Sequence, residues 1–229
     1  METSLHRSLK QIYAGKRAAT EVRLGGYRID AVVGKRLIEV QHGSLSSISR
    51  KVLALVQSHR VLVVKPIVMR KFLIKQPYCG AGAGERRLSP KQGSLLDLFE
   101  ELVYFTRVFP HQKLALETPL VEIEEWRYPG HGRRRRWRKN DFMVEDQKLI
   151  AIQGCMTFKT AADLWTLLGD VRPNQFDTQQ LAESLGVRRH VAQRIAYCLD
   201  RMGAAKQIGK RGNARLYEPI KQPGRKHAA

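Results

Sequence analysis

Apolar residues recur at helical spacing near the start of the chain and at strand spacing soon afterwards. Leu5, Leu9 and Ile12 lie on one helical face, which predicts a helix over residues 3–16. The next three apolar runs are short and separated by glycine-containing turns, which is typical of strands in a meander. These predicted strands are Thr20–Leu24, Tyr27–Val33 and Arg36–Gln41.

A second helix and a buried strand complete this N-terminal pattern. Ser44 or Ser46 can cap a helix that runs through about Ser58, with an apolar stripe that includes Val52 and Leu55. The run VLVVKPI that follows is continuously apolar, as in a strand that is covered on both faces of a sheet. The predicted order of elements in residues 1–75 is therefore α-β-β-β-α-β.

The middle region, residues 76–157, predicts a looser α+β extension. Residues 75–93 are rich in glycine, proline and charge and predict a connecting loop, whereas Ser94–Val108 predicts an amphipathic helix. LVEIEEW and FMVEDQKLIAIQ predict strands, the second compatible with a turn at Glu145-Asp146. We expect this region either to extend the N-terminal sheet or to form a small domain of its own.

Residues 158–220 carry a sharper pattern, which predicts three helices and a β-hairpin before a basic tail at 221–229. Asp177 and Gln180 have the spacing of a capping box, and Gly186 fits a tight turn between the second and third helices. The segments are TAADLWTLLG, DTQQLAESLG, VRRHVAQRIAYCLDRMG and AAKQIGKRGNARLYEPI.

The charge balance narrows the classes of partner. Lysine and arginine total 41 against 21 acidic residues, and a formal net charge of +20 suits a polyanion such as nucleic acid. No apolar run approaches the roughly 20 residues that span a bilayer, and no signal segment is recognisable. We therefore expect a soluble, cytoplasmic and nucleoid-associated protein. Three cysteines without a CxxC pair indicate neither a zinc site nor a disulfide framework.

A basic and aromatic segment interrupts the middle region. Seven arginine and lysine residues between Arg127 and Lys139 are interleaved with Tyr128 and Trp137. Guanidinium groups and aromatic rings together suit phosphate contact and base stacking, although charge runs are often only solvated surface. The residues expected to contact nucleic acid here are Arg133, Arg134, Arg135, Arg136, Arg138 and Lys139.

Residues 158–220 resemble the winged helix-turn-helix family. The resemblance lies in LAESLGV before a long helix, in the Arg-Met-Gly ending of that helix and in the GKRGN turn before Leu216-Tyr217. It implies that the third helix enters the major groove of DNA and that the wing contacts phosphates. Some winged helices serve as dimerisation modules instead, so a homodimer is also compatible with the sequence. The DNA contacts that the resemblance implies are Arg188, Arg189, His190, Gln193, Arg194, Lys210, Arg211 and Arg215.

Three of the four acidic residues before position 76 fall in one short stretch, as Glu21, Asp30 and Glu39. Because side chains alternate along a strand, Glu39 and Gln41 point to the same face, and a hairpin brings Asp30 towards them. Two carboxylates and a carbonyl oxygen suit Mg²⁺ or Mn²⁺, which can activate water and stabilise charge on a phosphodiester. The alternative is that Asp30 and Glu39 form salt bridges with Arg23, Arg28 or Lys51.

The segment EVRLGGYRIDAVVGKRLIEVQHGSLSSI, with the helix and HRVLVVKPI after it, resembles the PD-(D/E)xK restriction-endonuclease-like superfamily, in particular the branch of the competence protein CoiA. The resemblance implies an α/β restriction-endonuclease-like core in which Asp30 and Glu39 bind metal and Glu21 is an accessory carboxylate. Gln41 occupies the position of the usual catalytic lysine. Since glutamine is neutral, it can supply only the hydrogen-bonding part of that role.

These expectations combine into a DNA-binding, metal-dependent endonuclease that a C-terminal winged helix delivers to its substrate. The alternative is a catalytically inactive nuclease fold that serves as a DNA-binding regulator or architectural protein. An RNA-processing enzyme stays open as a third reading, because affinity driven by phosphate charge does not separate DNA from RNA.

Overall fold

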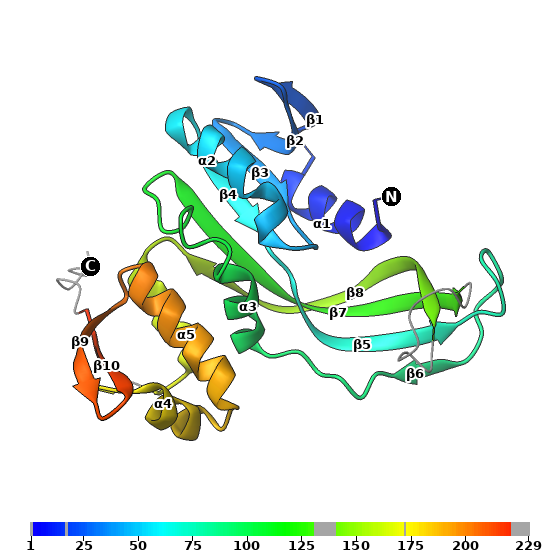
Figure 1. The fold of residues 1–229 in the computed structure, drawn as a ribbon. Helices are drawn as coiled ribbons and strands as arrows, with labels where there is room; N and C mark the ends of the chain where they lie inside the picture. The colour runs from blue at the N-terminus through cyan, green and yellow to red at the C-terminus, as the bar shows by residue number, and fades with distance from the viewer. Residues whose placement is uncertain (1, 17, 131–140, 172, 221–229) are drawn as a thin grey trace, which may run out of the picture. The chain divides into compact units, whose positions relative to one another are not determined.

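The computed structural model describes residues 2–16, 18–130, 141–171 and 173–220. The chain is a mixed α/β protein with one large mixed sheet and a separate two-stranded hairpin, which confirms the fold class at this level (Figure 1). It divides into two compact units that interleave along the sequence. Unit 1 comprises Met1–His42, Leu62–Ser94 and Glu117–Met156, and unit 2 comprises Gly43–Val61, Leu95–Leu116 and Thr157–Ala229.

Unit 1 begins with the predicted helix and meander of strands. Leu5 and Leu9 are fully buried, since α1 packs this apolar face against β2 and β3. Both strand pairs of the meander are antiparallel, and Ala31 of β2 lies opposite Ile38 of β3. The elements are α1 (Ser4–Ala14), β1 (Ala19–Leu24), β2 (Tyr27–Val33) and β3 (Arg36–Val40).

The middle region extends this sheet. The order is β1-β2-β3-β4-β7-β5-β6, and β8 pairs with β7 outside this path. In Figure 1, β5, β7 and β8 lie together as long ribbons, and β5 runs parallel to β7. The added strands are β4 (Arg60–Val64), β5 (Ile67–Lys75), β6 (Arg86–Leu88), β7 (Leu114–Pro129) and β8 (Phe142–Phe158).

The strand predicted over VLVVKPI is divided in the structure. β4 ends before Lys65 and Pro66, and β5 continues beyond them to Lys75. Proline has no backbone N–H for a sheet ladder, which accounts for the break. The pattern missed β5 because charged residues interrupt its apolar positions; Arg70 is paired with Glu122 and Lys71 with Glu125 on β7, each at 3.1 Å.

Two other predictions in the middle region were wrong. β8 runs without a turn through Glu145 and Asp146. The helix predicted over Ser94–Val108 is reduced to the 3₁₀ helix η2 (Leu95–Asp97) and the short α3 (Leu98–Leu102). The residues after Leu102 are VYF, and β-branched and aromatic residues have a lower helix propensity.

The segment predicted as a loop over 75–93 contains the strand β6, because its backbone packs closely against β5. Gly84 lies so close to this strand that a Cβ atom would stand 1.9 Å from the Lys75 carbonyl oxygen. Only glycine permits that approach. The segment therefore returns alongside β5, and β6 pairs with it in antiparallel register, with Arg87 opposite Leu73.

Asp146 of β8 fixes the start of α1. The backbone N–H and the hydroxyl of Ser4 donate hydrogen bonds to the Asp146 carboxylate at 2.8 and 2.6 Å. A carboxylate at a helix N-terminus satisfies free N–H groups and interacts favourably with the helix dipole. α1 is thus anchored at its N-terminal end by a strand 142 residues away in the sequence.

Unit 2 contains the predicted C-terminal helices and hairpin. Phe176 is fully buried between the edge of Trp165 and the face of Tyr217, with ring centroids 5.8 and 5.5 Å apart. No helix in the described part of the chain is long and apolar enough to cross a membrane. The elements of this unit besides η2 and α3 are η1 (Leu45–Ile48), α2 (Ser49–Ser58), the 3₁₀ helix η3 (Ala161–Leu168), α4 (Thr178–Leu185), α5 (Arg189–Arg201), β9 (Ala205–Arg211) and β10 (Ala214–Pro219).

Candidate functional site

The first candidate site lies in unit 1, where β2 and β3 approach the first turns of α1. Asp30 Oδ2 accepts a hydrogen bond from the backbone N–H of Val40 at 2.8 Å. It also lies 3.4 Å from His6 Nε2 of α1. Because Val40 directly follows Glu39, the Asp30 carboxylate is held against β3 beside the second predicted metal ligand.

The end of β3 adds two polar residues that the neighbouring strand positions. The Gln41 N–H donates to the Val64 carbonyl at 2.8 Å, and the Lys65 ammonium donates to the His42 carbonyl at 3.0 Å. Glu39 and Lys65 are only 4% and 5% exposed. The structure thus brings Asp30, Glu39 and Gln41 to adjacent positions and places a buried lysine beside the end of the same strand.

Lys65 was missed by the sequence reasoning. It stands inside the apolar run VLVVKPI, which predicts a strand covered on both faces but contains this one charge. Lysine is almost never fully buried unless it is paired, so a lysine in such a run is itself a signal of a polar site. That signal was present, but its neighbours across the sheet could not be identified without the strand order.

Glu21 belongs to a different set of contacts. It forms close ion pairs with Lys10 of α1 and Arg28 of β2, and Lys10 also lies 2.8 Å from Glu2. The hydrogen bond from Lys10 lowers the pKa of Glu21, and the Arg28 charge adds to this against an opposing effect of burial. The observed contacts therefore tie Glu21 to α1, instead of grouping it with Asp30 and Glu39 as an accessory carboxylate.

The donors of this site fit a hard divalent cation. Among the residues that the structure describes, no three or more His, Cys, Asp or Glu side chains form a cluster for a metal ion. Asp30 and Glu39 offer carboxylate oxygens alone. Two carboxylates suffice for Mg²⁺, which usually keeps several waters and takes further ligands from substrate phosphates.

The pKa values of two histidines near the site are shifted in opposite directions. The hydrogen bond with Asp30 raises the pKa of His6, although burial opposes this shift. Burial lowers the pKa of His42, and the Lys65 charge lowers it further. A neutral imidazole is therefore expected at His42 near neutral pH.

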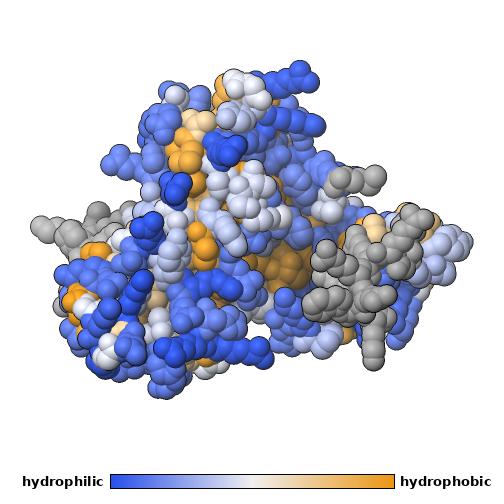
Figure 2. Space-filling model, in the orientation of Figure 1, coloured by the Kyte–Doolittle hydropathy of each residue, from blue (hydrophilic) through white to orange (hydrophobic). Residues whose placement is uncertain are grey.

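The second candidate site is a basic face of unit 2. Gly186 adopts the left-handed conformation with φ 62°, which ends α4 and permits the tight turn towards α5. Ile195 and Leu199 bury the inner side of α5, whereas its outer side and the β9–β10 hairpin are exposed. Figure 2 shows a mainly hydrophilic surface in this region. The predicted DNA contacts on the exposed side are Arg188, Arg189, His190, Gln193, Lys210, Arg211 and Arg215.

Arg194 differs from the other predicted contacts of α5. Its guanidinium lies 2.6 Å from Glu100 Oε1 of α3, and its side chain is 29% exposed. Arg194 directly follows Gln193 in α5, and the rotation of the helix from one residue to the next directs its side chain towards α3 instead of the outer side. Sequence reasoning missed two exposed residues at helical spacing on the outer side, Tyr197 and Arg201, which the i, i+4 period could have identified.

Six of the predicted nucleic-acid contacts lie outside the described residues. They are Arg133, Arg134, Arg135, Arg136, Arg138 and Lys139, between β7 and β8. The basic tail over 221–229 lies outside them as well.

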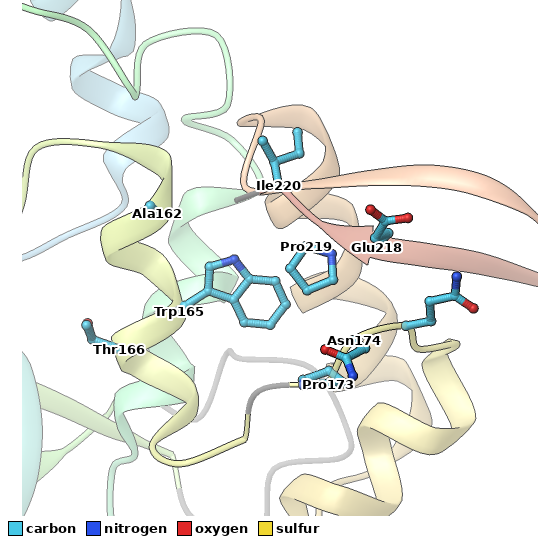
Figure 3. Close-up of a pocket in the computed structure, with 9 residues that line it drawn as sticks. Ala162, Trp165, Thr166, Pro173, Asn174, Glu218, Pro219 and Ile220 are labelled. Atoms are coloured by element: carbon cyan, nitrogen blue, oxygen red, sulfur yellow. The ribbon is translucent and has the colours of Figure 1, made fainter. Parts of the chain in front are cut away.

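Unit 2 also contains a pocket of about 810 Å³ next to the hairpin. Figure 3 shows Trp165 projecting from η3 towards Pro219, with Asn174 and Glu218 on the same side of the pocket. The Trp165 indole N–H donates to the Ala204 carbonyl at 3.1 Å, so the ring is fixed as part of the core. Among the described residues of the lining, the one charged side chain is the acidic Glu218, so these residues do not add to the basic face.

Comparison with known proteins identifies the family of the chain without an activity. A family described as "Domain of unknown function (DUF8091)" matches residues 3–159, which include every residue of the first candidate site. An "Uncharacterized protein" of Treponema pallidum (strain Nichols) is 30% identical over 218 residues, covering 94% of this chain and 84% of the relative. No solved structure matches the chain.

The ion pairs of Glu21 predict a pH-dependent contribution to stability. Since its folded pKa is lowered from 4.5, the contribution is present above pH 4.5 and is lost as the pH falls through the folded value. Glu21→Gln should lower the free energy of unfolding at pH 7 by about 1–3 kcal/mol, because the buried Lys10 ammonium loses one of its two carboxylate partners. Urea unfolding at pH 7 and near pH 3 measures the difference.

Glu100→Gln serves as the matched control, since Glu100 is 61% exposed in its pair with Arg194 and such pairs contribute at most about 1 kcal/mol. A Glu21→Gln protein as stable as wild type at pH 7 would show that the ion pairs of Glu21 with Lys10 and Arg28 do not stabilise α1 on the sheet.

Proposed function

The chain belongs to the DUF8091 family, and we propose that unit 1 is a restriction-endonuclease-like core that hydrolyses phosphodiester bonds in DNA with Mg²⁺ or Mn²⁺. Unit 2 would deliver that core to DNA through a winged helix. The observation that carries the proposal is the Asp30 carboxylate, held by the Val40 N–H beside Glu39. The α1-β1-β2-β3-α2-β4 order of elements agrees with it.

Each residue of the first site has a task in this proposal. Asp30 and Glu39 would hold the divalent cation, which on binding supplies a Lewis acid and a more acidic water. Gln41 would orient that water by hydrogen bonding. Lys65, which neighbours Gln41 across β3 and β4, would supply the positive charge that Gln41 lacks.

A specific observation also supports the catalytically silent alternative. The Asp30 carboxylate already contacts His6 and Val40, and Glu39 is nearly inaccessible to solvent. With Glu21 bound to Lys10 and Arg28, the site has two acidic donors instead of three. In this alternative the sheet is a scaffold, and the protein binds DNA without cutting it.

The arrangement of unit 2 supports its proposed role in delivery. An exposed helix N-terminus rich in arginine can enter a major groove, and a basic hairpin can reach the adjoining phosphates. Arg188 and Arg189 start α5, and Lys210, Arg211 and Arg215 surround the turn of the β9–β10 hairpin. We assign base and phosphate contacts to these two elements and the packing of α5 on α3 to Arg194.

Cleavage of DNA should require both carboxylates and a divalent metal. Asp30→Asn and Glu39→Gln keep the side-chain shape and remove the charge, so each should lower the cleavage rate by more than about 100-fold, since even outer-shell ligand partners contribute about 10–100-fold. The assay is nicking of supercoiled plasmid and forked oligonucleotides with Mg²⁺, Mn²⁺ or EDTA. Glu124→Gln, an acidic residue of β7 paired with Arg86, is the matched control.

Lys65→Met in the same assay tests the origin of the positive charge. Lys65→Met should lose most of the cutting activity, and the Lys65→Met/Gln41→Lys double variant should recover part of it. Circular dichroism confirms that each protein is folded. Folded wild-type protein that binds these substrates but never cuts them with either metal would establish the catalytically silent alternative.

DNA affinity should depend on the start of α5. Arg188→Ala/Arg189→Ala should weaken binding and reduce the slope of log affinity against log salt by about 2, because each lost phosphate contact contributes about 0.9. Fluorescence anisotropy with a duplex in EDTA at several salt concentrations measures both quantities. Arg60→Ala/Arg107→Ala removes the same charge from exposed positions of unit 2. Equal effects of the two double variants would remove α5 from the proposed contact surface.

A further inference from the structure

The large pocket of unit 2 opens where two segments of the chain separate beside β10. Phe176 and Tyr217 exchange two backbone hydrogen bonds, since each N–H donates to the other residue's carbonyl, at 2.9 and 2.8 Å. The next pair of this kind in antiparallel register would join Asn174 to Pro219. Proline has no backbone N–H, so this pair cannot form completely. The two segments diverge there, and the pocket of about 810 Å³ lies between them.

Much of the pocket lining is apolar. Trp165 is fixed by the hydrogen bond of its indole N–H, and its ring projects towards Pro219 (Figure 3). Ile220 is 38% exposed at the end of the hairpin. A ligand that covers these groups would remove apolar surface from water, which favours binding. The apolar residues of the described lining are Ala162, Trp165, Pro173, Pro219 and Ile220.

Three polar side chains of the lining are available to a ligand. Within the part of the chain that the structure describes, the side chains of Asn174, Gln175 and Glu218 form no hydrogen bond or ion pair. Lys206 lies opposite Glu218 in the β9–β10 register, but the two side chains form no ion pair. Glu218 is half-buried, so its carboxylate is accessible from the pocket. A ligand can therefore meet one carboxylate and two amide groups without breaking a described contact.

We propose that this pocket binds a small organic cation, a protonated amine carried on an apolar body. The ammonium group donates charge-assisted hydrogen bonds to the Glu218 carboxylate and a further one to Asn174 Oδ1. The apolar body covers Pro219, Ile220 and the accessible part of Trp165. The pocket volume is within the range of small-molecule sites. The site lies within unit 2 and uses none of the residues assigned to metal or DNA.

The test compares three probes that share one ring system, with the full chain in each titration. They are naphthylmethylamine, which is protonated at pH 7, the neutral naphthalenemethanol and the anionic naphthylacetate. Isothermal titration calorimetry gives each Kd. The amine should bind at least about 10-fold more tightly than the alcohol, because only the amine carries a charge that pairs with Glu218. The anion should bind more weakly than the alcohol.

Variants separate the charged contact from the apolar one. Glu218→Gln keeps the side-chain shape and removes the charge, so it should raise the Kd of the amine by about 10-fold and leave that of the alcohol unchanged. Ile220→Ala removes apolar surface alone and should weaken both probes to the same extent. Glu183→Gln is the matched control, since Glu183 is an acidic residue of α4 outside the described lining, and its Kd values should equal those of the wild type.

Equal Kd values for the amine and the alcohol in the wild type would overturn the proposal, as would equal losses in Glu218→Gln and Glu183→Gln. Absence of binding by all three probes at millimolar concentrations would also overturn it. Amine binding that is seen only after deletion of residues 221–229 would do the same, because the basic tail of the chain would then be the occupant.

Discussion

The hydrogen bond from the Val40 N–H to the Asp30 carboxylate is the interaction on which the first site depends. It joins the side chain of Asp30 on one strand to the backbone of the next strand, directly after Glu39. His6 approaches the same carboxylate from α1, whose own N-terminus is fixed by Asp146 of β8. The geometry at Asp30 thus rests on β2, β3 and, through α1, on β8.

The sheet also contains buried ion pairs outside this hairpin, between β5 and β7. Cross-strand pairs between β5 and β7 compensate each buried carboxylate with a cation, as Lys71 does for Glu125. Such pairs contribute little to stability when they are exposed, but removing one partner of a buried pair leaves an unpaired buried charge, which is strongly destabilising. The exposed cations Lys75 and Arg87 therefore stand out from their paired neighbours, and together with the basic face of unit 2 they contribute to the formal net charge of +20.

Periodicity alone predicted the N-terminal helix, the meander and the C-terminal helices and hairpin, because each is defined by contacts within a few residues. Strand alternation also predicted that Asp30 lies near the end of the next strand, where it accepts the Val40 N–H, since a tight turn sets the register of the hairpin. The partners of Glu21, Arg194 and Lys65 could not be predicted in this way. Their contacts follow from α1 lying on the sheet, α3 packing on α5 and β4 pairing with β3, which are tertiary relations that no local pattern encodes.

The central claim is that Asp30 and Glu39 together hold a divalent cation. Electron paramagnetic resonance of Mn²⁺, titrated with and without a phosphorothioate oligonucleotide, measures bound metal directly and independently of turnover. The account predicts bound Mn²⁺ in the wild type and in Glu124→Gln, tightened by the oligonucleotide and lost in folded Asp30→Asn and Glu39→Gln. Equal Mn²⁺ binding by all four proteins would contradict it.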